Sequence, residues 1–168
     1  MEKKIEKFAV GQKVVYPCHG VGEVVDIHEQ ELLGEITYLY VINFVHDKIK
    51  VKVPITRAIS DGLRPLIEKS NLKQIYSILQ GTPEASIYKM WSKKVQGYKK
   101  KINSGSPQLL ATVIRDLYKS AEINRSYSER KIYIAAMERL ATEISTLTGT
   151  SEEKVVNHIV MLLQLKLA

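Results

Sequence analysis

The sequence predicts an α+β protein in two domains: a small five-stranded, partly closed β-barrel, followed by an all-α domain of five helices. Segments within the first sixty or so residues alternate apolar and polar residues with the period of two that is typical of half-buried strands. The remainder shows helical spacing with capping signals. Charge divides in the same region, because residues 1–70 hold ten Lys/Arg and ten Asp/Glu, whereas residues 71–168 hold fifteen and eight. We therefore expect domains at 1–65 and 66–168.

The first domain consists of short strands with glycine and proline punctuation, a pattern that favours a small barrel. Gly20 and Gly22 are expected to bracket a turn between the first two strands. The strands are predicted at Lys13–Pro17, Glu23–His28, Ile36–Val45 and Lys48–Pro54.

The last of these segments alternates strictly between lysine and aliphatic residues, so each kind should occupy one face of the strand. The aliphatic residues Ile49, Val51 and Val53 are expected to line the barrel core. The lysine row has two interpretations, a solvated or charge-guarded edge and a docking edge for a protein partner. The pattern alone favours the first. The row consists of Lys48, Lys50 and Lys52.

Five helices are predicted from their boundary signals. Ser70 can cap a helix that runs to Gln80 and ends at Gly81. Thr82-Pro83 is expected to start the next helix, because proline suits a first-turn position. This second helix should present one apolar stripe, formed by Tyr88, Trp91, Val95, Tyr98 and Ile102.

Three further helices follow the same signals. Ser106-Pro107 opens one of them, and Ser126 with Glu129 forms a capping-box pattern for a long helix to about Leu147. Gly149 should end that helix. A second capping box and the final helix are predicted at Thr150, Glu153 and Val155–Leu167.

No enzymatic constellation stands out. Cys18-His19 could suggest a thiol and its base, but neighbouring residues on a strand point to opposite faces. The four histidines lack metal-ligand spacing, and Gly20-Val21-Gly22 lacks the third glycine of a dinucleotide site. We therefore expect no catalysis, no metal and no cofactor.

The chain offers no sign of a membrane partner. No apolar run approaches eighteen residues, and no signal-peptide or lipidation pattern occurs. Cys18 is the only cysteine, which excludes an intramolecular disulfide and favours a reducing compartment. The expected location is the cytoplasm, in association with the nucleoid.

Trp91, the only tryptophan, lies in a stretch from Ala85 to Arg115 that contains no acidic residue. Its place on an apolar stripe favours burial, because large aromatic residues are more often buried than exposed. The surrounding lysines, Lys99-Lys100-Lys101 among them, favour contact with phosphates. Because the whole basic excess lies in residues 71–168, nucleic-acid contact by this half is the better interpretation. No Arg, Asn and Gln pattern suited to base readout accompanies the stretch.

Motifs in both halves resemble the CarD/CdnL family of bacterial transcription regulators, over about residues 8–165. The first motif also opens the RNA-polymerase-interacting domain of transcription-repair coupling factor. The matching residues are Phe8-x-x-Gly11-x-x-Val14-Val15-Tyr16-Pro17-x-His19-Gly20-Val21-Gly22, Val53-Pro54, Gly62-Leu63-Arg64, Trp91-Ser92-Lys93-Lys94, Val113-Ile114-Arg115-Asp116-Leu117-Tyr118 and Ser126-x-x-Glu129-Arg130-Lys131.

This resemblance implies a Tudor-like (SH3-like) barrel that binds the β subunit of RNA polymerase, and a helical domain that contacts promoter DNA. It further implies that Trp91 wedges into the minor groove at the upstream edge of the transcription bubble and stabilises the open complex, in a non-enzymatic protein that we expect to be a monomer. The expected DNA contacts are Trp91, Lys93, Lys94, Lys99, Arg130 and Lys131.

Gln30 and Lys52 stand where some members have arginine on the polymerase-facing side. One guanidinium fork is thereby lost, and a point charge replaces the other. Two alternatives remain on this sequence: a free-standing, non-specific DNA-binding protein without a polymerase partner, and a scaffold whose basic half meets acidic protein or RNA.

Overall fold

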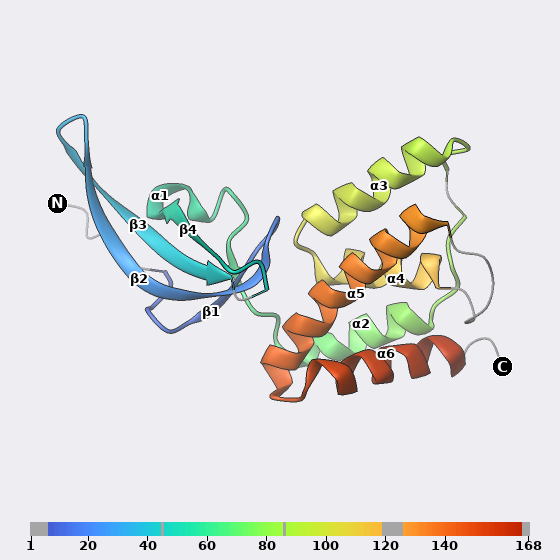
Figure 1. Ribbon diagram of the computed structural model, residues 1–168. Coiled ribbons are helices and arrows are strands. Elements are labelled where there is room, and N and C mark those ends of the chain that lie inside the picture. Colours follow the sequence, from blue (N-terminus) through green and yellow to red (C-terminus); the bar gives the residue numbers. More distant parts are fainter. Residues whose placement is uncertain (1–6, 45, 86, 119–125, 166–168) are drawn as a thin grey trace. The chain divides into compact units, whose positions relative to one another are not determined.

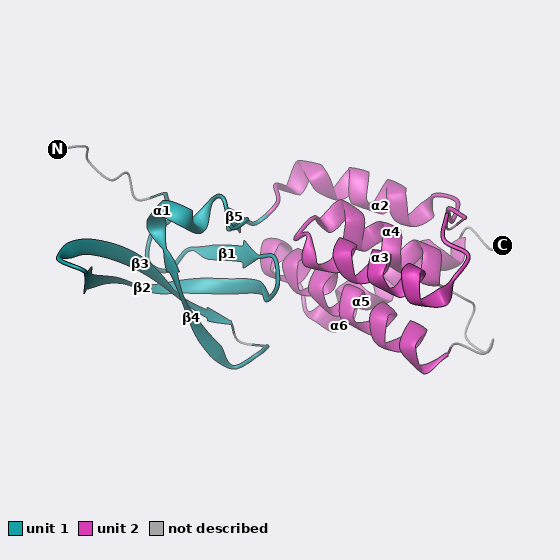
Figure 2. Cartoon of the chain, turned by 90° about the horizontal axis from the view of Figure 1, so that it is seen from above, with its two compact units in different colours: residues 1–66 teal, residues 67–168 magenta. Residues whose placement is uncertain are grey.

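The computed structural model describes residues 7–44, 46–85, 87–118 and 126–165 (Figure 1). The chain separates into two compact units, residues 1–66 and 67–168 (Figure 2). Val45 and residues 166–167, which end two predicted elements, lie outside the described residues. The α+β fold class is confirmed.

Unit 1 contains a five-stranded antiparallel sheet with the order β4-β3-β2-β1-β5. Strand β2 is much longer than predicted and forms a long hairpin with β3, with a bulge between Val24 and Asp26. A short helix, α1 (Ile55–Ala58), follows β4. The strands are β1 (Lys13–Tyr16), β2 (Gly20–Leu32), β3 (Glu35–Phe44), β4 (Ile49–Pro54) and β5 (Arg64–Pro65).

Alternate residues of β3 form the centre of the core in unit 1. Tyr40, Ile42 and Phe44 are all buried on one face of the strand. The Tyr40 hydroxyl accepts a hydrogen bond from the backbone N–H of Phe8 at 3.3 Å, which closes the N-terminal segment over this core. A Cβ on Gly22 would lie 2.7 Å from Ile42, so this glycine lets β2 approach the core residues of β3 closely.

Two predictions about the strands are wrong in detail. The turn before β2 precedes Gly20, and Gly22 lies within the strand. Strand β4 starts at Ile49, after Lys48, which adopts a positive φ of 53° in the preceding turn. Of the three residues of β4 expected in the core, Val53 is buried and Val51 is half-buried, whereas Ile49 at the start of the strand is 39% exposed.

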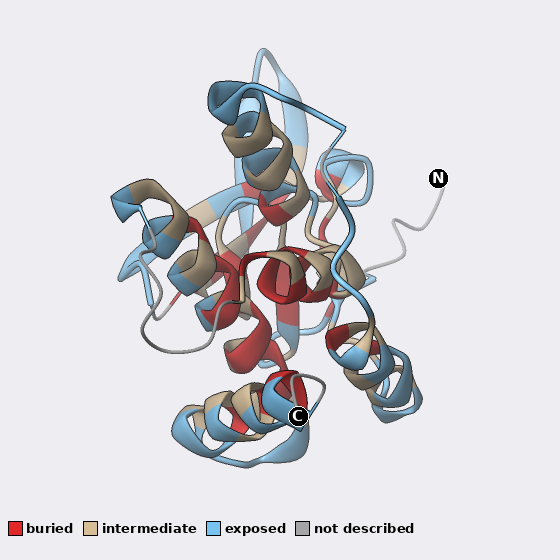
Figure 3. Cartoon of the chain, turned by 90° about the vertical axis from the view of Figure 1, so that its right-hand side faces the viewer, coloured by how far each residue is buried: buried red, intermediate tan, exposed pale blue. Residues whose placement is uncertain are grey.

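Unit 2 consists of helices around one apolar core, with the buried residues where the helices face one another (Figure 3). The predicted all-α region of about five helices is confirmed. A 3-10 turn, Lys69–Asn71, precedes them. The α-helices of the described part of this unit are α2 (Leu72–Gln80), α3 (Trp91–Asn103), α4 (Pro107–Leu117), α5 (Tyr127–Thr148) and α6 (Glu152–Leu165).

The starts of α4 and α5 and the end of α5 lie where the capping residues predicted them. Ser106 Oγ accepts a hydrogen bond from Leu109 N at 3.3 Å, and Ser126 Oγ accepts one from Glu129 N at 3.2 Å. Gly149 ends α5 in the left-handed conformation.

Other boundaries differ from the prediction. Ser70 lies inside the 3-10 turn, and Asn71 precedes α2 instead. Ser151 rather than Thr150 accepts the first-turn hydrogen bond of α6, from Lys154 N at 3.4 Å. Gly81 does end α2, but in an extended conformation.

The largest difference concerns Thr82-Pro83, which does not start a helix. The described residues between α2 and α3 are irregular, and α3 begins only at Trp91. The backbone N–H of Glu84 donates to Asp116 Oδ1 at 3.2 Å, which holds this connection against α4. A tertiary contact has overridden the local start signal.

Candidate nucleic-acid interface

Trp91 stands at the N-terminal end of α3 with 37% of its surface exposed. Its indole N–H donates a hydrogen bond of 3.1 Å to Ser128 Oγ on α5. The stripe behind it follows the prediction, since Val95 and Tyr98 are half-buried and Ile102 is buried. Trp91 is therefore the outer end of an apolar stripe, anchored at its polar edge and open to solvent over part of its ring.

The anchor of the indole is itself held by the cap of α5. Ser128 Oγ lies 3.3 Å from Ser126 Oγ, and Ser126 is the residue that caps α5 by accepting from Glu129 N. A change at either serine should therefore disturb both the start of α5 and the orientation of the Trp91 ring.

Helices α3 and α5 run side by side in the same direction (Figure 1). Two hydrogen bonds fix their register. One is the bond from Trp91 to Ser128, and the other runs from Arg139 Nη1 to the carbonyl of Ile102 at 3.1 Å. Each bond joins residues 37 positions apart. The two bonds therefore hold α3 and α5 in one parallel register, near the start and near the end of α3.

A groove of about 360 Å³ lies between these two bonds. Three cationic side chains line it together with aliphatic ones, and no lining residue is acidic. The lining residues are Val95, Lys99, Ile102 and Asn103 on α3, and Ser128, Lys131, Ile132, Ala135 and Arg139 on α5.

Of the predicted DNA contacts, the structure brings Trp91, Lys99 and Lys131 together at this groove. Lys93 and Arg130 are exposed but lie elsewhere on their helices. At about 100° per residue, Lys93 lies about 200° from Trp91, and Arg130 about 200° from Ser128. Lys94 is only half exposed. The predicted contacts thus do not share one surface, since Lys93 and Arg130 lie on faces of α3 and α5 turned away from Trp91 and Ser128.

Exposed apolar residues lie near Trp91 and Ser128 along the chain, and sequence periodicity did not identify them as a surface. Ile87 and Met90 precede α3 and are exposed, Ile87 by 86%. Tyr127 opens α5, is 76% exposed and has the Lys131 ammonium 5.5 Å from its ring centre. These residues could be found only from their closeness to Trp91 or Ser128 along the chain. That closeness becomes informative once the pairing of α3 with α5 brings Trp91 and Ser128 together.

Tyr88 was predicted on the α3 stripe and is instead outside the helix. Its ring lies 3.5 Å from where a Cβ on Gly97 would be, so the chain before α3 folds back along that helix. Glycine at position 97 leaves room for the ring.

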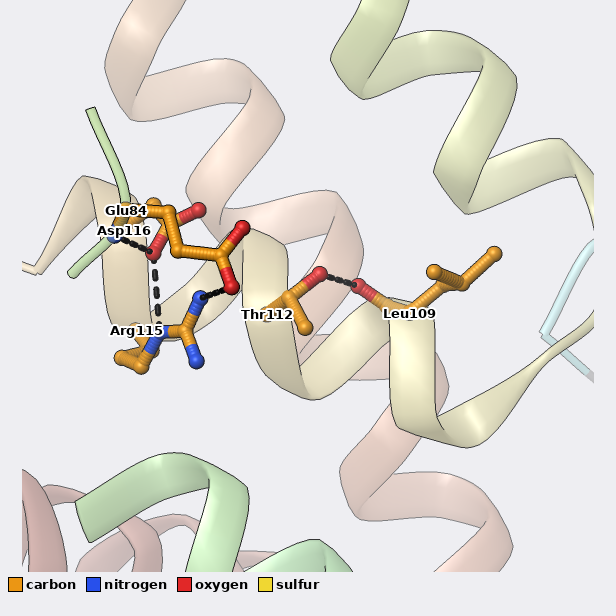
Figure 4. Close-up of polar contacts among 5 residues, drawn as sticks. All are labelled: Glu84, Leu109, Thr112, Arg115 and Asp116. Atoms are coloured by element: carbon orange, nitrogen blue, oxygen red, sulfur yellow. Dashed lines mark hydrogen bonds and ion pairs between the residues drawn. The ribbon is translucent and has the colours of Figure 1, made fainter. Parts of the chain in front are cut away.

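Arg115 does not belong to the exposed basic surface. It is buried, and its Nε donates to Asp116 Oδ1 at 2.8 Å, while Nη2 lies 3.8 Å from Glu84 Oε1 (Figure 4). Asp116 also accepts from Glu84 N. This cluster fastens the connection that leads to Trp91, so its contribution to the interface is positional.

Tyr98 responds to the same surroundings. Burial raises the pKa of its phenol, and the negative charges of Asp116 and Glu129 raise it further. The folded protein therefore favours the neutral form of the Tyr98 phenol, which packs against the core of unit 2.

The two compact units of the chain match two different domains of known proteins. Residues 8–67 match the CarD-like/TRCF RID domain, and residues 74–160 match the CarD C-terminal domain. A relative from Bacillus subtilis (strain 168), "Putative transcription factor YdeB", is 32% identical over 149 residues, which cover 88% of this chain and 97% of that relative. The chain belongs to the CarD family. It is a transcription factor of that family, and CarD-family transcription factors are not enzymes.

The RID match implies an interaction of unit 1 with RNA polymerase. Gln30 and Lys52, the residues expected to face the polymerase, are both exposed. Gln30 lies on β2 and pairs with Thr37 of β3, and Lys52 lies on β4 and pairs with Val41 of β3. Since these two partners are four residues apart, the side chains of Gln30 and Lys52 share the face of the sheet opposite to Tyr40 and the core.

Cys18 is exposed, and its neighbour His19 has partners of its own. His19 Nδ1 contacts Asp47 Oδ2 at 3.2 Å, and its ring stacks on Tyr16. Among the described residues, no three His, Cys, Asp or Glu side chains gather as a metal site would require. None of the helices in the described ranges combines the length and apolarity that crossing a bilayer requires.

Proposed function

We propose that this CarD-family protein docks on the β subunit of RNA polymerase through unit 1 and stabilises the open promoter complex through unit 2. Trp91 enters the minor groove at the upstream edge of the transcription bubble, and Lys93, Lys94 and Arg130 contact phosphates there. The observation that carries the proposal is the setting of Trp91. Its ring is partly exposed, a hydrogen bond to Ser128 holds it, and Ser128 lines a groove together with Lys99 and Lys131.

An apolar ring in this setting suits the chemistry of a wedge. Side chains that unstack a base step gain from contact with the exposed bases, on the order of 1–3 kcal/mol for stacking on an aromatic ring. Lysines add a sequence-independent attraction to the backbone. The protein can raise the occupancy of the open complex only by the difference between its affinities for open and closed promoter.

The face of unit 1 that bears Gln30 and Lys52 is the proposed polymerase-binding surface. Strand β4 is at one edge of the sheet, next to β3 alone, and Lys52 lies on it. An edge of this kind can receive a strand of a partner, with Lys52 as a point charge for an acidic group. The proposal includes a monomeric protein in the cytoplasm, associated with the nucleoid.

The test is the lifetime of the open complex on a promoter, measured with the full chain and with Trp91→Ala. Wild type should lengthen the lifetime, and the variant should lose most of that effect while still binding polymerase in a pull-down. A lifetime with Trp91→Ala equal to that with wild type, while the variant still binds polymerase, would exclude the wedge.

The alternative is a free-standing DNA-binding protein, which the basic excess of residues 71–168 would equally serve. The same pull-down separates the two functions. Retention of the wild-type chain by polymerase without DNA, weakened by Lys52→Glu, supports docking. Failure of polymerase to retain the chain would support the alternative.

A further inference from the structure

The α3–α5 groove combines cationic and aliphatic lining residues. Lys99, Lys131 and Arg139 line it from both helices, and none of its lining residues is acidic. Its remaining surface is largely aliphatic, with Ile102 and Ile132 at the base, both buried. An apolar base with cations around it suits a ligand that has both an apolar body and a negative charge.

The groove is also a fixed feature, because hydrogen bonds join the helices at both ends of it. The Trp91–Ser128 bond stands at one end and the Ile102–Arg139 bond at the other. Ala135, with its small side chain, faces the space between them. A preformed groove orders fewer groups when a ligand binds, which lowers the entropic cost of binding.

We propose that this groove binds one unpaired nucleotide of DNA, with the phosphate on Lys99 and Lys131 and the base against the aliphatic floor. The proposal rests on the proposed function, in which unit 2 meets partly melted promoter DNA. Charge complementarity selects an anion, and the apolar floor selects one with a flat, weakly polar body. The volume of about 360 Å³ falls in the range of small-ligand pockets and is too small for a base pair in duplex form.

Position connects the groove to the wedge. Ser128 lines the groove and also holds the indole of Trp91, so the ring stands at one end of the groove. A nucleotide displaced by the ring would have a receiving site next to it. Occupancy of the groove would favour melted over paired DNA, because a paired nucleotide cannot enter it.

The experiment measures anisotropy of labelled DNA with the full-length protein. The probes are the single strand (dT)4, a tetramer of abasic sites with the same phosphates, and a duplex of random sequence. The groove variants are Ala135→Leu, which fills the space, and the double variant Lys99→Gln/Lys131→Gln. The matched control, Lys93→Gln/Arg130→Gln, removes the same charge from the same two helices on other faces.

Wild type should bind (dT)4 several-fold more tightly than the abasic tetramer. Ala135→Leu should abolish that preference and leave duplex affinity within about twofold. The lysine double variant should weaken (dT)4 binding and lower the slope of log K against log salt by about 1.4, or about 0.7 for each lost phosphate contact with a single strand. The control variant should keep the preference for (dT)4.

The inference is wrong if wild type shows no preference for (dT)4, or if the control variant loses the preference as fully as the groove variants do. Equal competition by an acidic peptide such as octaglutamate would identify a general anion surface and would also overturn it. Two variants separate failure of this inference from failure of the proposed function. Loss of open-complex stabilisation in Trp91→Ala tests the wedge, whereas loss of the (dT)4 preference in Ala135→Leu, which keeps Trp91 and its bond to Ser128, tests the groove.

Discussion

Ser128→Ala is the substitution that tests most directly how Trp91 is held. It removes the only hydroxyl that accepts the indole N–H at 3.1 Å in the described part of the chain. A neutral hydrogen bond contributes about 0.5–1.5 kcal/mol net. Because the ring is 37% exposed and water can replace the serine, the lower part of that range applies, about 0.5–1 kcal/mol.

The expected consequence is a shorter open-complex lifetime. Without the bond, the ring samples other rotamers, and the wedge must be ordered again when DNA binds. At about 1.4 kcal/mol per factor of ten, a loss of 0.5–1 kcal/mol corresponds to a reduction of about two- to fivefold in the lifetime gained from the protein. Ser128→Thr keeps the hydroxyl and should retain most of the effect.

A double-mutant cycle with Trp91→Phe isolates the bond, because phenylalanine has no N–H to donate. Ser128→Ala should therefore have a smaller effect in the phenylalanine background, limited to what its contact with Ser126 contributes. The reasoning fails if Ser128→Ala leaves the lifetime unchanged or lengthens it, since a longer lifetime would mean that the bond has to break before DNA binds. Tryptophan emission of the free protein checks that the ring has moved.

Three further substitutions test the framework. Arg115→Gln leaves Asp116 without its buried partner and should lower the unfolding free energy of unit 2 by about 3–5 kcal/mol, followed by Trp91 fluorescence in urea. Gly22→Ala places a Cβ 2.7 Å from a core side chain and should destabilise unit 1 by about 1–3 kcal/mol in calorimetry. The fold raises the pKa of Tyr98, so the neutral phenol contributes its full stabilisation of the folded protein below about pH 10, the pKa of an unfolded tyrosine. That stabilisation is lost as the pH rises through the folded-state pKa. Tyr98→Phe should therefore reduce the loss of stability at alkaline pH. An identical alkaline loss in that variant would contradict the assignment.

Local chemistry made much of the helical unit predictable. Ser106 and Ser126 satisfy backbone N–H groups within their own first turns, and the αL glycine at 149 ends its helix within a few residues. Such signals need no information from elsewhere in the chain. The start signal at Pro83 failed for the opposite reason, because the backbone of Glu84 bonds to Asp116, 32 positions away.

The candidate site divides in the same way. Composition and spacing identified Trp91 and its lysines, but they could not say whether the ring is buried or exposed. The answer depends on Ser128, which lies 37 positions along the chain and receives its orientation from the register of two helices. The groove was invisible to the sequence for that reason. Arg115, conversely, belongs to the basic stretch by sequence, and only its burial beside Asp116 shows its structural role.

The separation of Trp91 and the groove from Lys93 and Arg130 suggests how a small unit could distinguish melted from paired DNA. Contacts from Lys93 and Arg130 to phosphates would form on duplex and open promoter alike, and such uniform binding shifts no equilibrium. The ring of Trp91 and the groove behind Ser128 would gain contacts only when bases leave the stack. The phosphate contacts would then set how tightly the protein stays on DNA, and the ring and groove would set how strongly it favours the open state.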